Sequence, residues 1–445
     1  MKKFKQLVKG ALHRLPDEGR GIKATVRKLQ MKKEIATANL IGRLEGARLP
    51  DPYTIYWTDP ARVNFHTNYK VDSPDWEDFV FDQNKFVAQV QDGDWDLPLH
   101  RVADMRVCRA ISERIHQGVA WHATEYYQHA ISQINDGREL WDCSDRASFD
   151  RRCDEIDRLI ESIDSKGYCE RLADPSMSAY SGGKEILINI SRDGLCLFQD
   201  GRHRLAIALA LGLKRVPVQV LVRHSGWQSF RELMHHMARG DGGASKRGVL
   251  YQTPMHFDLA DIPSEHACED RWEAIKNKLD AASGMALDIG CNLGFFCHRL
   301  EESGYSCVGV EYLPTIALAA RKIAYAEDRK LKIVTGDILS SETLREVGDS
   351  GFDVVIALNI FHHFIKTKDG YERLRQFMSN VQIGAMFFEP HHPDEPQMQG
   401  VFINPPPNEF VQLVKDWGGF EKAERIYTAT DGRMIFKLEQ QRRKR

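Results

Sequence analysis

The chain has 445 residues, of which 42% are hydrophobic and 28% charged, a balance typical of a soluble globular protein. No apolar run approaches the roughly 20 residues that a membrane helix needs, and the N-terminus lacks the apolar core of a signal peptide. The nine cysteines form no C-x-x-C pair, which indicates reduced, mostly buried thiols in a cytoplasmic protein.

Residues 1–49 are predicted to form a basic amphipathic arm. Residues 1–48 hold thirteen Lys/Arg against four Asp/Glu, and the chain ends in the basic run 442–445, whereas the net charge of the whole is −2. Basic amphipathic segments lie on anionic membranes, bind nucleic acid, or are simply solvated helices. All three interpretations stay open, and the first of them predicts peripheral contact at the inner membrane face.

A mixed region follows the arm. Two prolines at 50 and 52 stop the arm, and residues 53–57 read as a strand. Residues 100–172 have mostly helical periodicity, and Gly167 can end the last of these helices. Residues 185–198 then read as a hairpin around an Arg-Asp-Gly turn, and residues 217–222 read as another strand.

A charged box stands between that hairpin and a short helix. It comprises Asp200, Gly201, Arg202, His203 and Arg204. Positive side chains at the positive end of a helix dipole are unfavourable unless an anion binds there, so the box is a predicted phosphate-binding site. The alternative is that both arginines pair with acids of the same domain.

The box resembles the Gly-x-His/Arg-Arg motif of the ParB/sulfiredoxin-like superfamily, with Gly201, Arg202, His203 and Arg204 at the matching positions. This resemblance implies an α+β domain over residues 50–239 that binds a nucleotide, ATP or CTP with Mg, or another anion. His203 stands where sulfiredoxin has its cysteine, and no helix-turn-helix segment follows the box. These differences argue against sulfinic acid reduction and DNA partitioning, and leave a phosphotransferase or an anion-binding domain as the predicted function of this region.

Residues 240–249 contain four glycines in ten positions and are predicted to be a linker. Beyond it, an apolar run leads into a glycine-rich turn and a helical pattern, as in a nucleotide-binding strand, loop and helix. Three further apolar runs each end in a polar residue, at the positions that line a ligand site in a doubly wound fold. The polar and glycine positions of this set are Asp288, Gly290, Asn292, Gly294, Glu311, Asp337 and Asn359.

Residues 250–440 resemble the class I S-adenosylmethionine-dependent methyltransferases, an α/β Rossmann-like fold. That family usually has glycine where this chain has Asn292, a residue that tolerates positive φ. The resemblance implies that Asp288, Gly290 and Gly294 line the methionine end of the cofactor, that Glu311 accepts the ribose hydroxyls and that Asp337 faces the adenine amine. It also places Asn359 at the edge of the active site.

Two histidine pairs, 362–363 and 391–392, and Glu389 follow the fourth and fifth strands and are predicted to converge on the acceptor side of the pocket. They can form an acid–base set, an anion-binding wall or a metal site. Adjacent histidines on one element are expected to point apart, which disfavours a metal. We therefore predict His362, His363 and Glu389 as catalytic residues, and no metal.

The sequence thus predicts an O-methyltransferase for a glycan, a sugar phosphate or a related polar acceptor, in bacterial surface-polysaccharide synthesis. The layout is similar in logic to bifunctional kinase–methyltransferases that cap O-antigen chains, although the kinase there has a different fold. One alternative is an RNA or DNA methyltransferase that uses the basic termini. Another is a nucleotide-sensing scaffold without activity.

Overall fold

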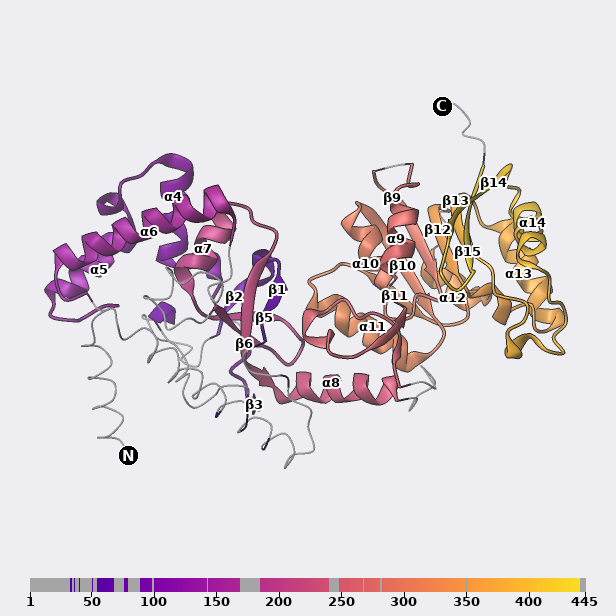
Figure 1. Ribbon diagram of the computed structural model, residues 1–445, viewed down its shortest axis with the longest axis horizontal. Coiled ribbons are helices and arrows are strands. Elements are labelled where there is room, and N and C mark those ends of the chain that lie inside the picture. The colour runs from indigo at the N-terminus through magenta and orange to yellow at the C-terminus, as the bar shows by residue number, and fades with distance from the viewer. Residues whose placement is uncertain are drawn as a thin grey trace. The chain divides into compact units, whose positions relative to one another are not determined.

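A computed structural model of the protein describes residues 54–67, 76–78, 89–97, 100–141, 143–168, 185–239, 248–266, 268–280, 282–348 and 351–440, with the single positions 33, 36, 40 and 50. Nearly all of the basic arm, the C-terminal run 441–445 and linker residues 240–247 lie outside the described residues. The chain divides into two compact units, residues 1–232 and 233–445 (Figure 1). Each unit is described by itself.

The first unit combines helices with a mixed sheet. Its strands are β1 (Tyr56–Thr58), β2 (Phe65–His66), β3 (Gln89–Gln91), β4 (Ile186–Ile190), β5 (Cys196–Asp200) and β6 (Val216–His224). Its helices are α4 (Arg106–Gln117), α5 (Glu125–Asn135), α6 (Arg146–Lys166), α7 (Arg202–Ala210) and α8 (Ser225–Ala238), which crosses the division between the units. The sheet order is β1-β6-β4-β5-β2, and β3 also pairs with β6.

Local sequence signals explain these elements. Helix α6 begins at an Asp145–Ser148 capping box and ends at Gly167, which has a φ of 73°. Strands β4 and β5 form the expected antiparallel hairpin, and α7 begins directly after the left-handed Gly201. The mixed α+β character agrees with the sequence, but the ParB/sulfiredoxin-like superfamily is not confirmed.

The second unit is a doubly wound α/β domain. A small parallel pair, β7 (Leu250–Gln252) and β8 (Ser264–His266), and α9 (Glu269–Lys276) lead into the main sheet. The sheet strands are β9 (Gly284–Ile289), β10 (Tyr305–Glu311), β11 (Lys332–Thr335), β12 (Phe352–Leu358), β13 (Ile383–Glu389), β14 (Lys422–Thr428) and β15 (Met434–Glu439). The helices between them are α10 (Phe295–Glu302), α11 (Pro314–Ala326), α12 (Ser341–Val347), α13 (Lys368–Asn380) and α14 (Pro407–Gly418).

The order of this sheet is β11-β10-β9-β12-β13-β15-β14, and all neighbours are parallel except the two pairs that include β15. The chain first winds outward from β9 to β11 and then crosses back to β12. The winding direction therefore reverses between β9 and β12. In open α/β sheets, ligands bind at the carboxyl ends of the strands at such a reversal.

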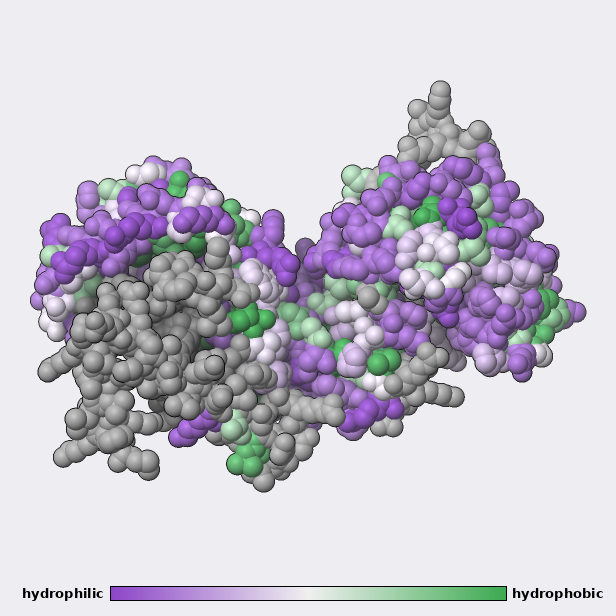
Figure 2. Space-filling view, viewed as in Figure 1, coloured by the Kyte–Doolittle hydropathy of each residue, from purple (hydrophilic) through white to green (hydrophobic). Residues whose placement is uncertain are grey.

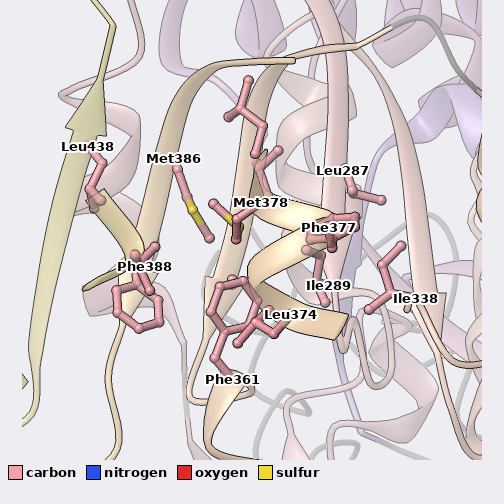
Figure 3. Packing of buried hydrophobic residues seen from close by; sticks show 14 of the residues in the cluster. Leu287, Ile289, Ile338, Phe361, Leu374, Phe377, Met378, Met386, Phe388 and Leu438 are labelled. Atoms are coloured by element: carbon pink, nitrogen blue, oxygen red, sulfur yellow. The ribbon is translucent and has the colours of Figure 1, made fainter. Parts of the chain in front are cut away.

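Both faces of this sheet are buried, which explains its near-continuous apolar strands. On one face, Leu287 and Ile289 of β9 pack with α13 and α14; Figure 3 shows Leu374, Phe377 and Met378 of α13 against the strands. On the other face, apolar side chains of α9, α10 and α11 pack against the sheet. Burial of this kind contributes ~25 cal/mol per Å² of apolar surface and fixes the strand ends that carry polar residues.

The outer surface of each unit is predominantly hydrophilic in the view of Figure 2, with apolar residues in scattered patches. Among the described residues, no helix combines the length and the apolar composition needed to cross a membrane.

Candidate active site

The loop from Gly290 to Gly294 joins β9 to α10 in a conformation that few residues adopt. Gly290, Asn292 and Gly294 have φ values of 74°, 51° and 82°, so Asn292 takes the left-handed conformation that the sequence predicted. At Gly290 a Cβ would lie 2.8 Å from Ile360 side-chain atoms, so only glycine fits. The backbone N–H of Gly290 donates to the carbonyl of Val310, which ties the loop to β10.

Glu311 ends β10 and holds this loop in place. Its Oε2 accepts from the backbone N–H of Asn292 at 3.0 Å, and its Oε1 accepts from that of Leu313 at 2.8 Å. Burial raises the pKa of Glu311, while these backbone donors lower it. The carboxylate therefore faces the ligand site from a fixed position.

Asp337 occupies the corresponding place after β11. One carboxylate oxygen accepts from the backbone N–H of Leu339 at 2.9 Å, and the other accepts from Arg373 at 2.8 Å. Asp337 is therefore oriented by two partners, and its remaining lone pairs are available to a ligand.

A cavity of about 600 Å³ lies at the reversal between β9 and β12, within the ~300–1,000 Å³ common for small-molecule sites. Seven of the predicted residues line it: Gly290, Asn292, Glu311, Asp337, Asn359, His362 and His363. Asp288 and Glu389 instead line a much smaller cavity, which shares Tyr251, Ile289, Gly290 and Leu358 with the large one. Gly294 lines neither cavity and serves to begin α10.

Asp288 is 3% exposed and lies on the strand below the loop. The Cys297 thiol donates to its Oδ2 at 3.5 Å. Burial raises the pKa of Asp288 to about 7, and the nearby charge of Glu311 adds to the rise. The carboxyl group is therefore poised between its neutral and charged forms near neutral pH.

The four histidines are only partly brought together. His362 is buried and His363 is exposed, yet their ring centroids are 4.0 Å apart, so the expectation that they point apart is wrong. They share one turn of 3-10 helix, Phe361–His363, whose tight winding keeps the rings in contact. The His391 ring lies 5.7 Å from that of His362, whereas His392 is exposed and lies near Asp394.

His362 has an unusual environment. It is 2% exposed, and neither ring nitrogen has a hydrogen-bond partner among the described residues. Burial lowers its pKa to about 2, and the neighbouring positive groups, His363 first, lower it further. The ring is therefore neutral at physiological pH, with one donor and one acceptor nitrogen on the cavity wall.

Glu389 ends β13 and pairs with Arg271 of α9, whose Nε lies 2.9 Å from Oε2. Burial raises the pKa of Glu389, and Arg271 opposes that rise. This ion pair keeps the carboxylate in the smaller cavity. The structure therefore separates Glu389 from the two histidines with which the sequence grouped it.

Sequence reasoning missed the segment before β9. Tyr251 lines both cavities, and its hydroxyl accepts from Nδ2 of Asn359 at 3.2 Å. The Oδ1 of Asn359 is buried without a partner among the described residues. No motif marks Tyr251 or Arg271, because their positions depend on how residues 250–276 fold back on the sheet.

The charged box of the first unit is engaged in internal contacts. Arg204 lies 3.4 Å from the buried Glu185 carboxylate, and its guanidinium donates to Tyr168 at 3.3 Å. Arg202 lies over the Trp141 ring at 5.5 Å, and the Tyr126 hydroxyl is 3.1 Å from Nε2 of His203.

Burial lowers the pKa of His203 well below its usual value, and Arg152, Arg202 and Arg204 lower it further. Gly201 is the N-cap of α7, and Asp200 accepts from its backbone N–H. For Arg204, the internal ion pair that the sequence left as the alternative is present. The positive charges of Arg152, Arg202 and Arg204 nevertheless all lie near enough to His203 to lower its pKa.

Within the described residues, no group of three or more His, Cys, Asp or Glu side chains is arranged to hold a metal ion.

Comparison with known proteins finds similarity in the part of the chain that carries this site. Residues 287–382 match the family described as "Methyltransferase domain". A tRNA U34 carboxymethyltransferase of Helicobacter acinonychis is 26% identical over 133 residues, which are 30% of this chain and 49% of that protein. The O-antigen chain terminator bifunctional methyltransferase/kinase WbdD of Escherichia coli is 25% identical over 172 residues, 37% of this chain and 24% of that protein.

A crystal structure of WbdD is 22% identical and covers 43% of this chain and 44% of that one, with a TM-score of 0.37. The chain thus spans about half or less of the length of the curated relatives it matches. The matched family and the WbdD relative are named for methyl transfer, and the Helicobacter relative is named for carboxymethyl transfer. The C-terminal region of this chain is accordingly a methyltransferase domain.

Proposed function

We propose that the protein transfers a methyl group from S-adenosylmethionine to an oxygen of a glycan or a related polar acceptor. The observation that carries this proposal is the 600 Å³ cavity at the β9–β12 reversal, with Glu311, Asp337 and Asn359 at three successive strand ends. The unpartnered Oδ1 of Asn359 and the left-handed loop at Asn292 fit a ligand that approaches the backbone closely.

The residues present suit the parts of this cofactor. Glu311 would accept from the ribose hydroxyls, Asp337 from the adenine amine, and the loop at Gly290 would leave room for the methionine end beside Asp288. When bound, the cofactor supplies an activated methyl group, so that the protein needs mainly to align the acceptor and exclude water. His362 and His363 line the same cavity and are the candidates to hold the acceptor.

The glycan acceptor and the setting in surface-polysaccharide synthesis rest on the similarity to WbdD, which is named an O-antigen chain terminator. The similarity to a tRNA carboxymethyltransferase keeps RNA as the second candidate acceptor. Incubation of the full-length protein with labelled methyl donor, and with glycans or tRNA, separates the two. Label in RNA, with salt-sensitive binding, would favour the second candidate.

The first unit is proposed as an anion-binding module, and a phosphotransferase is one form it could take. Support comes from Arg152, Arg202 and Arg204, whose positive charges lower the pKa of His203 beside the start of α7. The ligands to test are ATP, CTP with Mg²⁺, and sugar phosphates. Calorimetry on the full-length protein and its Arg202→Ala variant measures this binding, and no heat with any of these ligands would leave the internal ion pairs as the sole role of the box.

A further inference from the structure

The charges on the wall of the large cavity bear on the identity of the methyl acceptor. Among the described residues, the wall includes two carboxylates, Glu311 and Asp337, and neither lysine nor arginine. Three cations near the wall have partners of their own. Arg373 pairs with Asp337, the Lys366 ammonium donates to Gln397 at 3.0 Å, and Arg433 pairs with Glu395 at 3.1 Å.

Such a wall is poorly suited to an anionic acceptor. A phosphate monoester carries roughly −1.5 to −2 charges at neutral pH, and a carboxylate carries one. Burial of an anion is costly unless cations or several donors compensate it. Phosphate and carboxylate sites are usually built from arginines or lysines, and the described wall contains neither, while its two carboxylates are assigned to the cofactor.

The wall does suit an uncharged hydroxyl group. The buried, neutral ring of His362 presents one acceptor and one donor nitrogen, both without a protein partner among the described residues. A hydroxyl group is likewise both a donor and an acceptor. A bound sugar hydroxyl would therefore give a hydrogen-bond partner to a buried polar group that has none among the described residues.

Building on the proposed methyl transfer, we propose that the acceptor is an uncharged hydroxyl of a sugar or another polyol, that His362 takes its proton, and that His363 passes the proton to solvent. His363 is suited to the last step because it is exposed and its ring centroid is 4.0 Å from that of His362. A phosphate or carboxylate acceptor would need neither histidine as a base.

The step balances. The acceptor oxygen forms a bond to the methyl carbon, the carbon–sulfur bond breaks, and its electron pair stays on sulfur, while the hydroxyl proton moves to a ring nitrogen of His362. One positive charge thus disappears from sulfur as one appears on the imidazole, and the net charge of the cavity is unchanged. This compensation matters because burial in the ligand-free site strongly disfavours protonated His362. The same burial keeps the ring unprotonated but also weakens it as a base, so the proton transfer depends on the simultaneous loss of the positive charge on sulfur.

The test compares matched acceptors on the full-length protein. Calorimetry with S-adenosylhomocysteine present measures the binding of neutral methyl hexosides, hexose 6-phosphates and hexuronic acids, and labelled methyl donor measures turnover. We expect the neutral glycosides to bind at least tenfold more tightly than either anionic series, and the label to appear in an ether. Tighter binding or preferred methylation of the phosphates or uronates would overturn the proposal, as would failure of every neutral glycoside to bind.

Variants test the role of the histidines. His362→Gln should slow turnover by about 10²–10⁴-fold while the affinity for S-adenosylhomocysteine is kept. His363→Ala should cause a smaller loss that added imidazole restores, a response that a purely structural residue would not give. His392→Gln is the matched control, because that ring is exposed and outside the cavity.

The outcomes separate two failures. If the wild-type protein does not bind S-adenosylhomocysteine, the proposed methyl transfer itself fails. If it does bind, but both His362→Gln and His363→Ala turn over at the wild-type rate, only the assignment of the acceptor and its base is wrong.

Discussion

Replacement of Asp288 by Asn tests how strongly burial controls the charge of this carboxyl group near the end of β9. The pKa of Asp288 rises from 3.8 to about 7 because the carboxyl group is buried, although the Cys297 thiol donates a hydrogen bond to it. At about 1.36 kcal/mol per pKa unit, this difference corresponds to roughly 4 kcal/mol. That energy is the cost of ionising the buried group in the folded protein.

The direction in which stability changes with pH follows from the number of protons bound by each state. The unfolded chain loses the Asp288 proton near pH 4 and the folded chain near pH 7, so the folded state holds more protons between these values. Stability therefore falls as pH rises through this window, and the full cost is present above about pH 7. Asp288→Asn does not titrate. We expect its stability advantage over wild type to grow by roughly 2 kcal/mol between pH 5.5 and pH 8.5.

Amide hydrogen exchange of peptides that cover β9 measures this difference in the full-length protein. Because both proteins are compared at each pH, the intrinsic exchange rates cancel, and 2 kcal/mol corresponds to about 30-fold slower opening in the variant. Asp394→Asn, at an exposed site, serves as the control. If the ratio of exchange rates between Asp288→Asn and wild type is the same at every pH, the buried carboxyl group does not control stability and the reasoning is refuted.

Four further predictions follow from single contacts. Glu311→Ala removes the charged acceptor of the loop and should weaken S-adenosylmethionine binding at least tenfold in calorimetry, since hydrogen bonds to charged groups are worth ~1.5–3 kcal/mol. Asn292→Val should lower the free energy of unfolding by about 1–2 kcal/mol, whereas Asn292→Gly should not, because φ is 51°. Arg204→Met deprives buried Glu185 of its cation and should cost about 3–5 kcal/mol in urea denaturation. Deletion of residues 1–49 should abolish sedimentation with anionic liposomes, and salt should do the same to the intact chain.

Each of these has a contrary outcome. Unchanged cofactor affinity in Glu311→Ala would remove the ribose assignment. Equal stability of the two Asn292 variants would mean that the loop conformation is not strained. If Arg204→Met is no less stable but loses nucleotide binding, the box acts as a ligand site instead of an internal ion pair. Equal liposome binding with and without residues 1–49 would exclude the membrane interpretation of the arm.

Five strands of the main sheet in the second unit, in their order along the chain, and the residues at their ends could be predicted from the sequence alone. Carboxyl ends of parallel strands meet at one edge of a sheet, so the spacing of Gly290, Glu311, Asp337 and Asn359 predicts that they lie together, and all four line one cavity. The left-handed conformation of Asn292 was also predictable, because few other residues adopt it. These features depend on local chain geometry and on a regular topology.

The direction of individual side chains was decided by tertiary packing. Glu389 is the last residue of a strand in the same sheet, yet its carboxylate pairs with Arg271, more than a hundred residues away in the chain, and lines the smaller cavity. One turn of 3-10 helix keeps His362 and His363 in contact, one buried and the other exposed, whereas His392 turns to solvent. Sequence spacing fixes which edge a residue occupies, but burial and charge partners arise only when distant segments pack, and they determine which groups can do chemistry.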